Sequence, residues 1–195
     1  MLKNTIILVS ALAVLLPIGI HIRDVSWGET PLLLATFPIF GLLAFTLLWL
    51  HSMSGVFEES LRKMFNFDAF VHWSSLVILV SILLHPLLLL ASINFDLLII
   101  FGSHPLPIWL GAIGLTLLLT YDIGKLLKRH EFFQRHWQDI LTISTIGFLL
   151  IFFHSLQLGS DLQGGFLRKL WVFYGVTAIL ATIYTYGIKR YTSRR

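Results

Sequence analysis

The stretch "VHWSSLVILVSILLHPLLLL", residues 71–90, is long and apolar enough to cross a bilayer, yet it carries two histidines. A membrane-spanning helix needs about 20 mainly apolar residues. An ionisable side chain inside such a helix is costly and by default marks a functional site. His72 and His85 are therefore the first residues of this sequence that need an explanation.

The composition of the whole chain fits an integral membrane protein. Of its 195 residues, 56% are hydrophobic and only 12% are charged, and the mean hydropathy is +0.84. Soluble domains carry about twice that share of charge. The chain has no cysteine, which excludes disulfides, thiolate metal sites and cysteine-ligated iron–sulfur clusters. Histidines or carboxylates must therefore hold any metal.

Five other apolar runs accompany residues 71–90, and together they predict an all-α, polytopic membrane protein built as a six-helix bundle. No internal repeat, low-complexity linker or soluble domain is visible, so we expect a single transmembrane domain over residues 1–195. The apolar loop 93–105 is expected to lie in the membrane interface. The predicted spans are residues 4–22, 31–52, 68–92, 106–127, 137–158 and 166–189.

The basic residues predict the orientation of these spans. Eleven of the 14 Lys and Arg residues fall on one side of the predicted topology, and only Arg23, Arg168 and Lys169 fall on the other. The positive-inside rule then places both termini in the cytoplasm, for a multi-pass protein of the inner (plasma) membrane. The same rule explains the net charge of +4, so this charge does not indicate binding to nucleic acid. We expect membrane lipid to surround the chain. The eleven are Lys3, Arg62, Lys63, Lys125, Lys128, Arg129, Arg135, Lys189, Arg190, Arg194 and Arg195.

A third histidine, His154, is placed to match His85. His85 follows Asp68, at the start of its span, by the same interval by which His154 follows Trp137, at the start of another. The two spans run in the same direction, from inside to outside, so both imidazoles are expected at a similar depth in the outer half of the membrane. Two such histidines on neighbouring helices are suited to axial ligation of a haem iron. The alternative is that each imidazole only hydrogen-bonds a backbone carbonyl on a neighbouring helix.

Three segments together resemble the ferric reductase-like transmembrane domain family, which includes ferric reductases, NADPH oxidases and the membrane subunit of the bacterial methionine-sulfoxide reductase system. They cover the third, fifth and sixth predicted spans, and the resemblance extends over residues 31–190. The segments are "VHWSSLVILVSILLHPLLLL" (71–90), "RHWQDILTISTIGFLLIFFH" (135–154) and "LGSDLQGGFLRKLWVF" (158–173).

The resemblance implies two stacked haems between the third and fifth helices. Electrons would pass from a cytoplasmic flavin through both haems to an acceptor on the outer face. His85 and His154 would hold the outer haem. The inner haem would need His72 and a histidine four residues after Trp137.

The sequence departs from the family pattern at the inner haem. The residue four after Trp137 is Leu141, which cannot bind iron. The interval from His72 to His85 is also one position shorter than the interval that the family commonly has. On an ideal helix, the shorter interval leaves the two side chains about 140° apart, whereas the common one leaves them about 40° apart. We therefore expect one haem b, on the outer side, and His136 or His51 is the alternative ligand for a second, inner haem.

Other candidate residues have weaker assignments. Arg168 and Lys169 are expected either to pair with haem propionates or to anchor the chain at the interface. His21, His104 and His130 are expected in loops and have no assigned role. Aromatic residues near the span ends are expected to form an interfacial belt; these are Trp73, Trp137, Trp171 and Tyr174.

The leading function is a membrane haem-b electron-transfer subunit. The sequence contains no G-x-G-x-x-G or other phosphate-binding loop, so the chain is expected to lack its own flavin or nicotinamide domain. The donor would be a flavoprotein partner or a quinol, with the flavin only on that partner. The acceptor would be a periplasmic partner protein, Fe(III) or oxygen. The chain is thus expected to be an oxidoreductase component, and whether it is itself an enzyme stays open. The alternatives are a haem-free scaffold or assembly subunit, and a small proton-coupled transporter using His72, Asp122 and His85.

Overall fold

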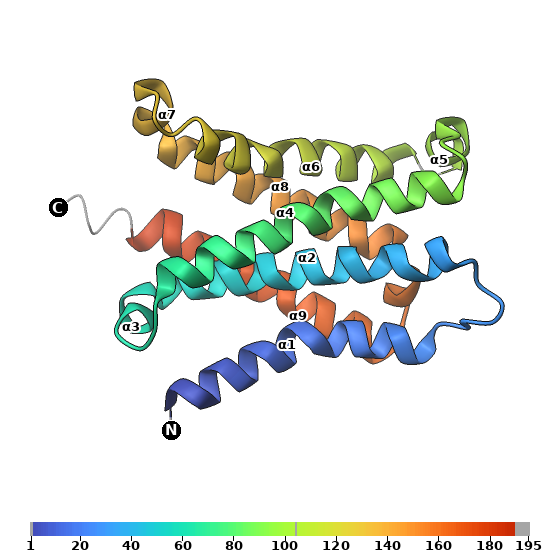
Figure 1. The fold of residues 1–195 in the computed structure, drawn as a ribbon, viewed down its shortest axis with the longest axis horizontal. Coiled ribbons are helices and arrows are strands. Elements are labelled where there is room, and N and C mark those ends of the chain that lie inside the picture. Colours follow the sequence, from blue (N-terminus) through green and yellow to red (C-terminus); the bar gives the residue numbers. More distant parts are fainter. Residues whose placement is uncertain (1, 104, 190–195) are drawn as a thin grey trace. The chain divides into compact units, whose positions relative to one another are not determined.

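The computed structural model describes residues 2–103 and 105–189, and all regular secondary structure within these ranges is helical (Figure 1). Six helices of this part are long and apolar enough to span a membrane, so the chain is a multi-pass, all-α membrane protein. Their ends agree with the predicted spans to within four residues. They are α1 (Leu2–Asp24), α2 (Leu32–Val56), α4 (Phe67–Ser92), α6 (Pro105–Leu126), α8 (Trp137–Leu158) and α9 (Gly165–Thr182), which continues as the π-helix η2 (Ile183–Lys189).

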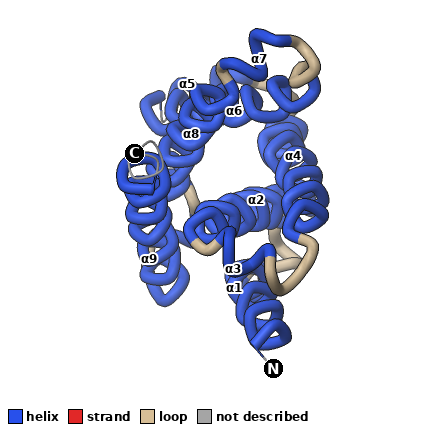
Figure 2. The backbone as a smooth tube through the Cα atoms, turned by 90° about the vertical axis from the view of Figure 1, so that its left-hand side faces the viewer, coloured by secondary structure: helices blue, strands red, loops and turns tan. Residues whose placement is uncertain are grey.

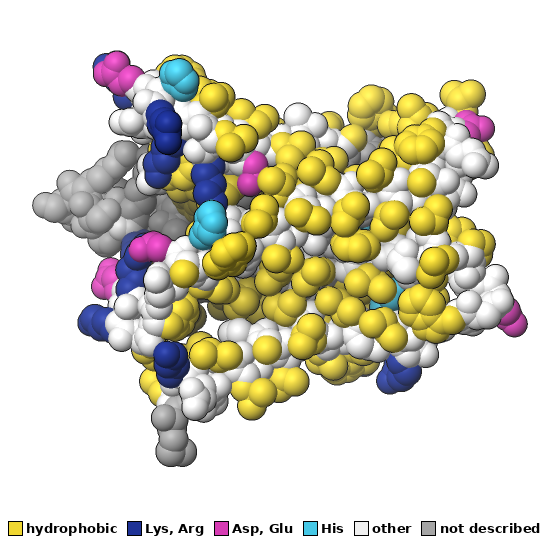
Figure 3. Space-filling view, in the orientation of Figure 1, with side chains coloured by type: hydrophobic (Ala, Val, Ile, Leu, Met, Phe, Trp, Pro, Cys, Tyr) yellow, Lys and Arg dark blue, Asp and Glu magenta, His cyan; other side chains and the backbone are white. Residues whose placement is uncertain are grey.

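Short helices connect the long ones. They are α3 (Glu58–Arg62), α5 (Leu97–Ser103), α7 (Glu131–Arg135) and the 3₁₀ helix η1 (Ser160–Leu162). The loop 93–105 that was predicted to be interfacial contains α5. Hydrophobic side chains cover much of the face seen in Figure 3, and Leu76, Val80 and Leu83 on α4 are among the exposed ones. Apolar side chains in such numbers are stable at the surface when lipid, and not water, surrounds them.

The helices group into two compact units. Unit 1 comprises residues 1–97 and 164–195, and unit 2 comprises residues 98–163. That residues 1–195 form a single transmembrane domain stays a prediction.

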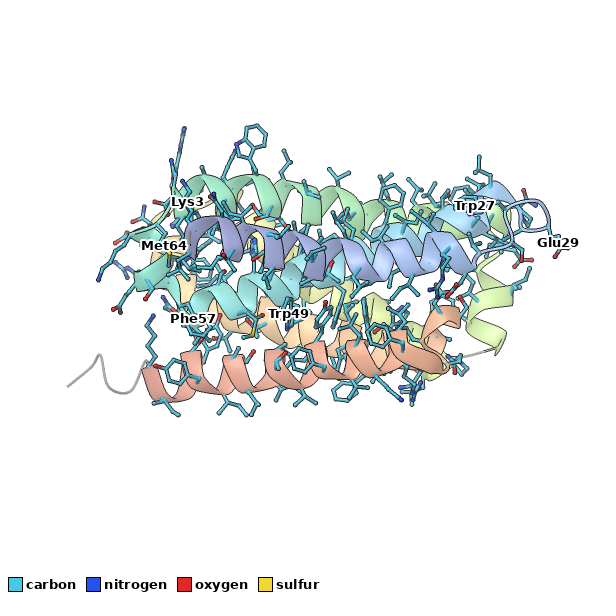
Figure 4. All side chains as sticks on the ribbon, turned by 90° about the horizontal axis from the view of Figure 1, so that it is seen from below. Lys3, Trp27, Glu29, Trp49, Phe57 and Met64 are labelled. Carbon is cyan, nitrogen blue, oxygen red and sulfur yellow. The ribbon has the colours of Figure 1, made fainter. Side chains whose placement is uncertain are left out.

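In unit 1, α2 is the central helix and contacts α1, α4 and α9 (Figure 2). Phe45 of α2 stacks on Trp171 of α9 with ring centroids 4.2 Å apart, and Trp49 stacks on Tyr174 at 4.3 Å. Trp49 lies on the side of α2 that faces α9 (Figure 4). Trp171 is 1% exposed and Tyr174 is 2% exposed. The prediction that these two residues belong to an interfacial belt is therefore wrong, because they form the core of the α2–α9 contact.

In unit 2, α6 and α8 pack as an antiparallel pair joined through α7. Gly114 and Gly147 allow the two backbones to approach closely. A methyl carbon on Gly147 would lie 2.7 Å from the carbonyl oxygen of Gly114 and 2.8 Å from the amide nitrogen of Leu118. Small residues at such crossings are typical of helix pairs in membranes, where close van der Waals packing drives association.

The ends of α4 are defined by local chemistry. Asn66 caps the start, because its side-chain oxygen accepts a hydrogen bond of 3.0 Å from the amide of Ala69. At the other end, Asn94 and Phe95 have φ values of 52° and 60°. The amide of Phe95 donates to the carbonyl of Leu90 at 2.8 Å, which closes the last turn.

In unit 1 the described basic residues lie at both ends, with more of them toward the end of Lys3 than toward the end of Arg23, Arg168 and Lys169. In unit 1, Lys3 lies at the same end as Phe57 and Met64, and Trp27 and Glu29 lie at the opposite end (Figure 4). In unit 2 the basic residues lie in the last turn of α6, in the loop after it and in α7. Three arginines in the charge count, Arg190, Arg194 and Arg195, lie outside the described residues, as does His104. The cytoplasmic location of the termini stays a prediction.

Candidate functional site

His85 is held against α2 by a backbone hydrogen bond. Its Nδ1 lies 2.8 Å from the carbonyl oxygen of Phe37, and the imidazole also contacts the Phe37 ring at 5.3 Å between centroids. A carbonyl oxygen only accepts, so Nδ1 must donate the proton. In the neutral ring this places the lone pair on Nε2.

Gly41, one turn after Phe37, provides the space for this imidazole. A methyl carbon at Gly41 would lie 2.8 Å from both Nδ1 and Cε1 of His85. That is closer than carbon atoms approach ring atoms in folded proteins, so the imidazole fits in this orientation because residue 41 has no side chain. We call Phe37, Gly41 and His85 the His85 cluster.

His154 in unit 2 has the same surroundings. Its Nδ1 lies 2.7 Å from the carbonyl oxygen of Pro107 on α6. A methyl carbon at Gly111, one turn after Pro107, would lie 2.6 Å from Nδ1 and Cε1 of the imidazole. We call Pro107, Gly111 and His154 the His154 cluster.

The two clusters have the same arrangement of residues, although they lie in different units. In each, a histidine on one long helix donates through Nδ1 to a carbonyl on the partner helix, and a glycine four residues later makes room for the ring. Metal-ligating histidines usually donate their second ring nitrogen to a carbonyl or carboxylate, which fixes the tautomer and the ring orientation. Each imidazole thus makes the hydrogen bond to a carbonyl on a neighbouring helix that the alternative interpretation expects. The tautomer that this bond fixes is also the one that an Nε2 ligand needs. The placement of His85 and His154 on one haem stays a prediction.

In the part of the chain that the structure describes, His72 belongs to no cluster of this kind. His72 is exposed near the start of α4, where its ring contacts Trp73 edge-on at 5.3 Å. Leu141, at the position of the missing ligand, is a half-buried residue of α8.

The two alternative inner ligands each make a side-chain contact, and their role as ligands of a second haem stays a prediction. His51 of α2 lies with Nε2 2.6 Å from the hydroxyl oxygen of Ser74 on α4. Ser74 itself donates to the carbonyl of Phe70, so the Nε2–H of His51 donates to Ser74. His136 lies just before α8 with Nδ1 3.1 Å from Asp139 Oδ2, and both side chains are at least half exposed.

Arg168 and Lys169 lie near the start of α9 in unit 1, where Arg168 is half-buried and Lys169 is exposed. Their pairing with haem propionates stays a prediction. Of the three residues named for a proton path, His72 and His85 lie on α4 in unit 1, and Asp122 lies on α6 in unit 2. That path also stays a prediction.

His21, which was expected in a loop without a role, makes a buried contact between two helices. In the structure it lies in the last turn of α1 and is 3% exposed. Its Nε2 lies 2.8 Å from the carbonyl oxygen of Ala35 on α2. The expectation of a loop is wrong because α1 continues to Asp24 and turns His21 toward α2. The signal available in the sequence was that His21 still lies within the predicted span 4–22.

No family model, no curated protein and no solved structure matches this chain. Within residues 2–103 and 105–189, no three histidine, aspartate or glutamate side chains come together as ligands for a bare metal ion. A haem iron needs only two axial ligands from the protein, because the porphyrin supplies the other four. The two histidine clusters are therefore the features of this chain that could bind a haem.

Proposed function

We propose that this chain is a membrane haem-b electron-transfer subunit of the inner membrane that passes electrons to an acceptor on the outer face. His85 and His154 would be the axial ligands of one haem b. A separate flavoprotein or a quinol would supply the electrons. When bound, the haem would supply one-electron redox chemistry, while the chain provides ligands, depth and insulation from water.

The observation that carries this proposal is the Nδ1-to-carbonyl hydrogen bond in both clusters, at 2.8 Å for His85 and 2.7 Å for His154. This bond fixes the tautomer in which Nε2 has the lone pair that haem iron needs. The described surroundings are apolar long helices, which suit a large hydrophobic cofactor. The residues present therefore fit the group.

Ligation of a single iron by the two histidines rests on the sequence. The two histidines lie equally far into long apolar helices, counted from Asp68 in one case and from Trp137 in the other. Leu141 supports one haem and not two. The resemblance to the ferric reductase-like family supports the same assignment, with Arg168 as the proposed partner of a propionate.

Spectra of ligand variants test the proposal. His85→Ala and His154→Ala should each abolish the low-spin haem signal of the purified protein, because one imidazole cannot maintain a six-coordinate iron. His72→Phe is the matched control, since it removes a histidine of the same helix as His85, and it should leave the haem content unchanged. Circular dichroism and gel filtration would establish that each variant is folded. A normal low-spin spectrum in either alanine variant would overturn the assignment.

A further inference from the structure

We infer that Gly41 and Gly111 are positioning residues for the two imidazoles, a role that rests on the proposed function of His85 and His154 as haem ligands. Each glycine lies four residues after the carbonyl that accepts from the histidine. A methyl carbon would lie 2.8 Å from the His85 ring at Gly41 and 2.6 Å from the His154 ring at Gly111.

Contact with an imidazole distinguishes Gly41 and Gly111 from four glycines of the long helices, Gly19, Gly55, Gly114 and Gly147. A methyl carbon on Gly19 or Gly55 would have no neighbour within 4 Å. On Gly114 or Gly147 it would meet the backbone or aliphatic side chain of the facing helix. Gly19 and Gly55 are therefore controls for a glycine in open space, and Gly114 and Gly147 are controls for a glycine that only allows helices to pack.

The atoms that a methyl group would displace belong to a side chain and not to the backbone. The helices therefore do not need to separate, and the imidazole has to turn or retreat. Because Nδ1 is among the nearest atoms at both positions, that movement breaks the bond to the Phe37 or Pro107 carbonyl. The tautomer is then no longer fixed, and Nε2 no longer points where the carbonyl held it.

The consequence for a haem protein is specific. Alanine is a better helix former than glycine, so the substitution does not disfavour the helix itself. It would move the imidazole away from the position in which its Nε2 could bind a haem iron, and a haem held by one histidine would be high-spin. A role in packing alone would instead lower the stability of the fold and leave the coordination state unchanged.

The experiment compares Gly41→Ala and Gly111→Ala with Gly55→Ala, which lies on the same helix as Gly41 and in open space. Electron paramagnetic resonance and visible spectra would be recorded on the purified full chain. We expect loss of the low-spin signal in the first two variants and none in Gly55→Ala. Added imidazole, a free replacement ligand, should restore a low-spin spectrum in both. Unchanged low-spin spectra in both variants would overturn the inference.

A second readout separates this inference from the proposed function. The ¹⁵N shifts of labelled histidine side chains report which ring nitrogen carries the proton, with or without haem. His85→Phe and His154→Phe would assign the signals. If the wild-type protein proves haem-free, the proposed function fails. The positioning role then stands only if Gly41→Ala moves the His85 signals and Gly111→Ala moves those of His154, while Gly55→Ala moves neither. Unmoved signals in the first two variants would overturn it.

Discussion

The hydroxyl of Tyr174 donates a hydrogen bond of 2.8 Å to the carbonyl oxygen of Ala13. Ala13 precedes Pro17 by four residues in α1, and proline has no amide hydrogen to donate within the helix. Tyr174 of α9 therefore supplies the donor that α1 lacks. This hydrogen bond connects α1 and α9, the first and last long helices of unit 1. It lies where Pro17 interrupts the hydrogen bonds within α1.

Tyr174→Phe should lower the free energy of unfolding by about 1 kcal/mol, because a partly buried carbonyl loses its donor. Thermal unfolding in detergent, followed by circular dichroism, measures this loss. Tyr184→Phe is the matched control, since Tyr184 is 42% exposed. In a Pro17→Ala background, residue 17 regains an amide donor, and the effect of Tyr174→Phe should shrink. An equal loss in both backgrounds would contradict the explanation.

His21→Ala should destabilise unit 1 by about 1–3 kcal/mol, because a buried ring and its bond to the Ala35 carbonyl are lost. His130→Ala, at an exposed position, should stay within about 0.5 kcal/mol of wild type. The same unfolding experiment compares the two variants. If they behave alike, His21 does not hold α1 against α2.

Gly147→Ala should weaken the α6–α8 pair by about 1–3 kcal/mol, because the methyl group meets the backbone of the facing helix and forces the helices apart. Gly102→Ala in the same unit has open space around it and serves as the control. Unfolding midpoints of the two variants give the comparison. A midpoint for Gly147→Ala at or above that of Gly102→Ala would show that the close approach of the two backbones is not needed.

Both termini should lie in the cytoplasm. A fluorescent reporter that folds only in the cytoplasm should be active when fused after residue 195. An alkaline phosphatase reporter fused there should be inactive, and the same reporter fused after Gly164 should be active. The opposite pattern would show that the excess of basic residues does not set the orientation.

Hydropathy was sufficient to predict the long helices, because about 20 apolar residues have few alternatives in a bilayer. It was insufficient to predict which face of a helix is buried. Trp171 and Tyr174 lie near a span end in the sequence, where aromatic residues usually anchor to lipid. They instead point into the α2–α9 contact, because Phe45 and Trp49 on α2 offer flat faces at the matching spacing.

The histidines of the candidate site could be found from the sequence, because an ionisable residue in an apolar run is conspicuous. The glycines could not. Gly41 lies on the long helix that precedes the helix of His85, and Gly111 lies on the long helix that precedes the helix of His154. The contact between each glycine and its histidine can be recognised only when the register between α2 and α4, or between α6 and α8, is known.

The most direct test of the central claim is the amount of haem per polypeptide in the purified wild-type chain, measured together with its electron paramagnetic resonance spectrum. We expect a ratio near one and the low-spin signal of an iron with two imidazole ligands. A folded but colourless protein would contradict the proposed function. A ratio near two would contradict the single-haem assignment, and would show that His72 has an iron-ligating partner that Leu141 does not provide.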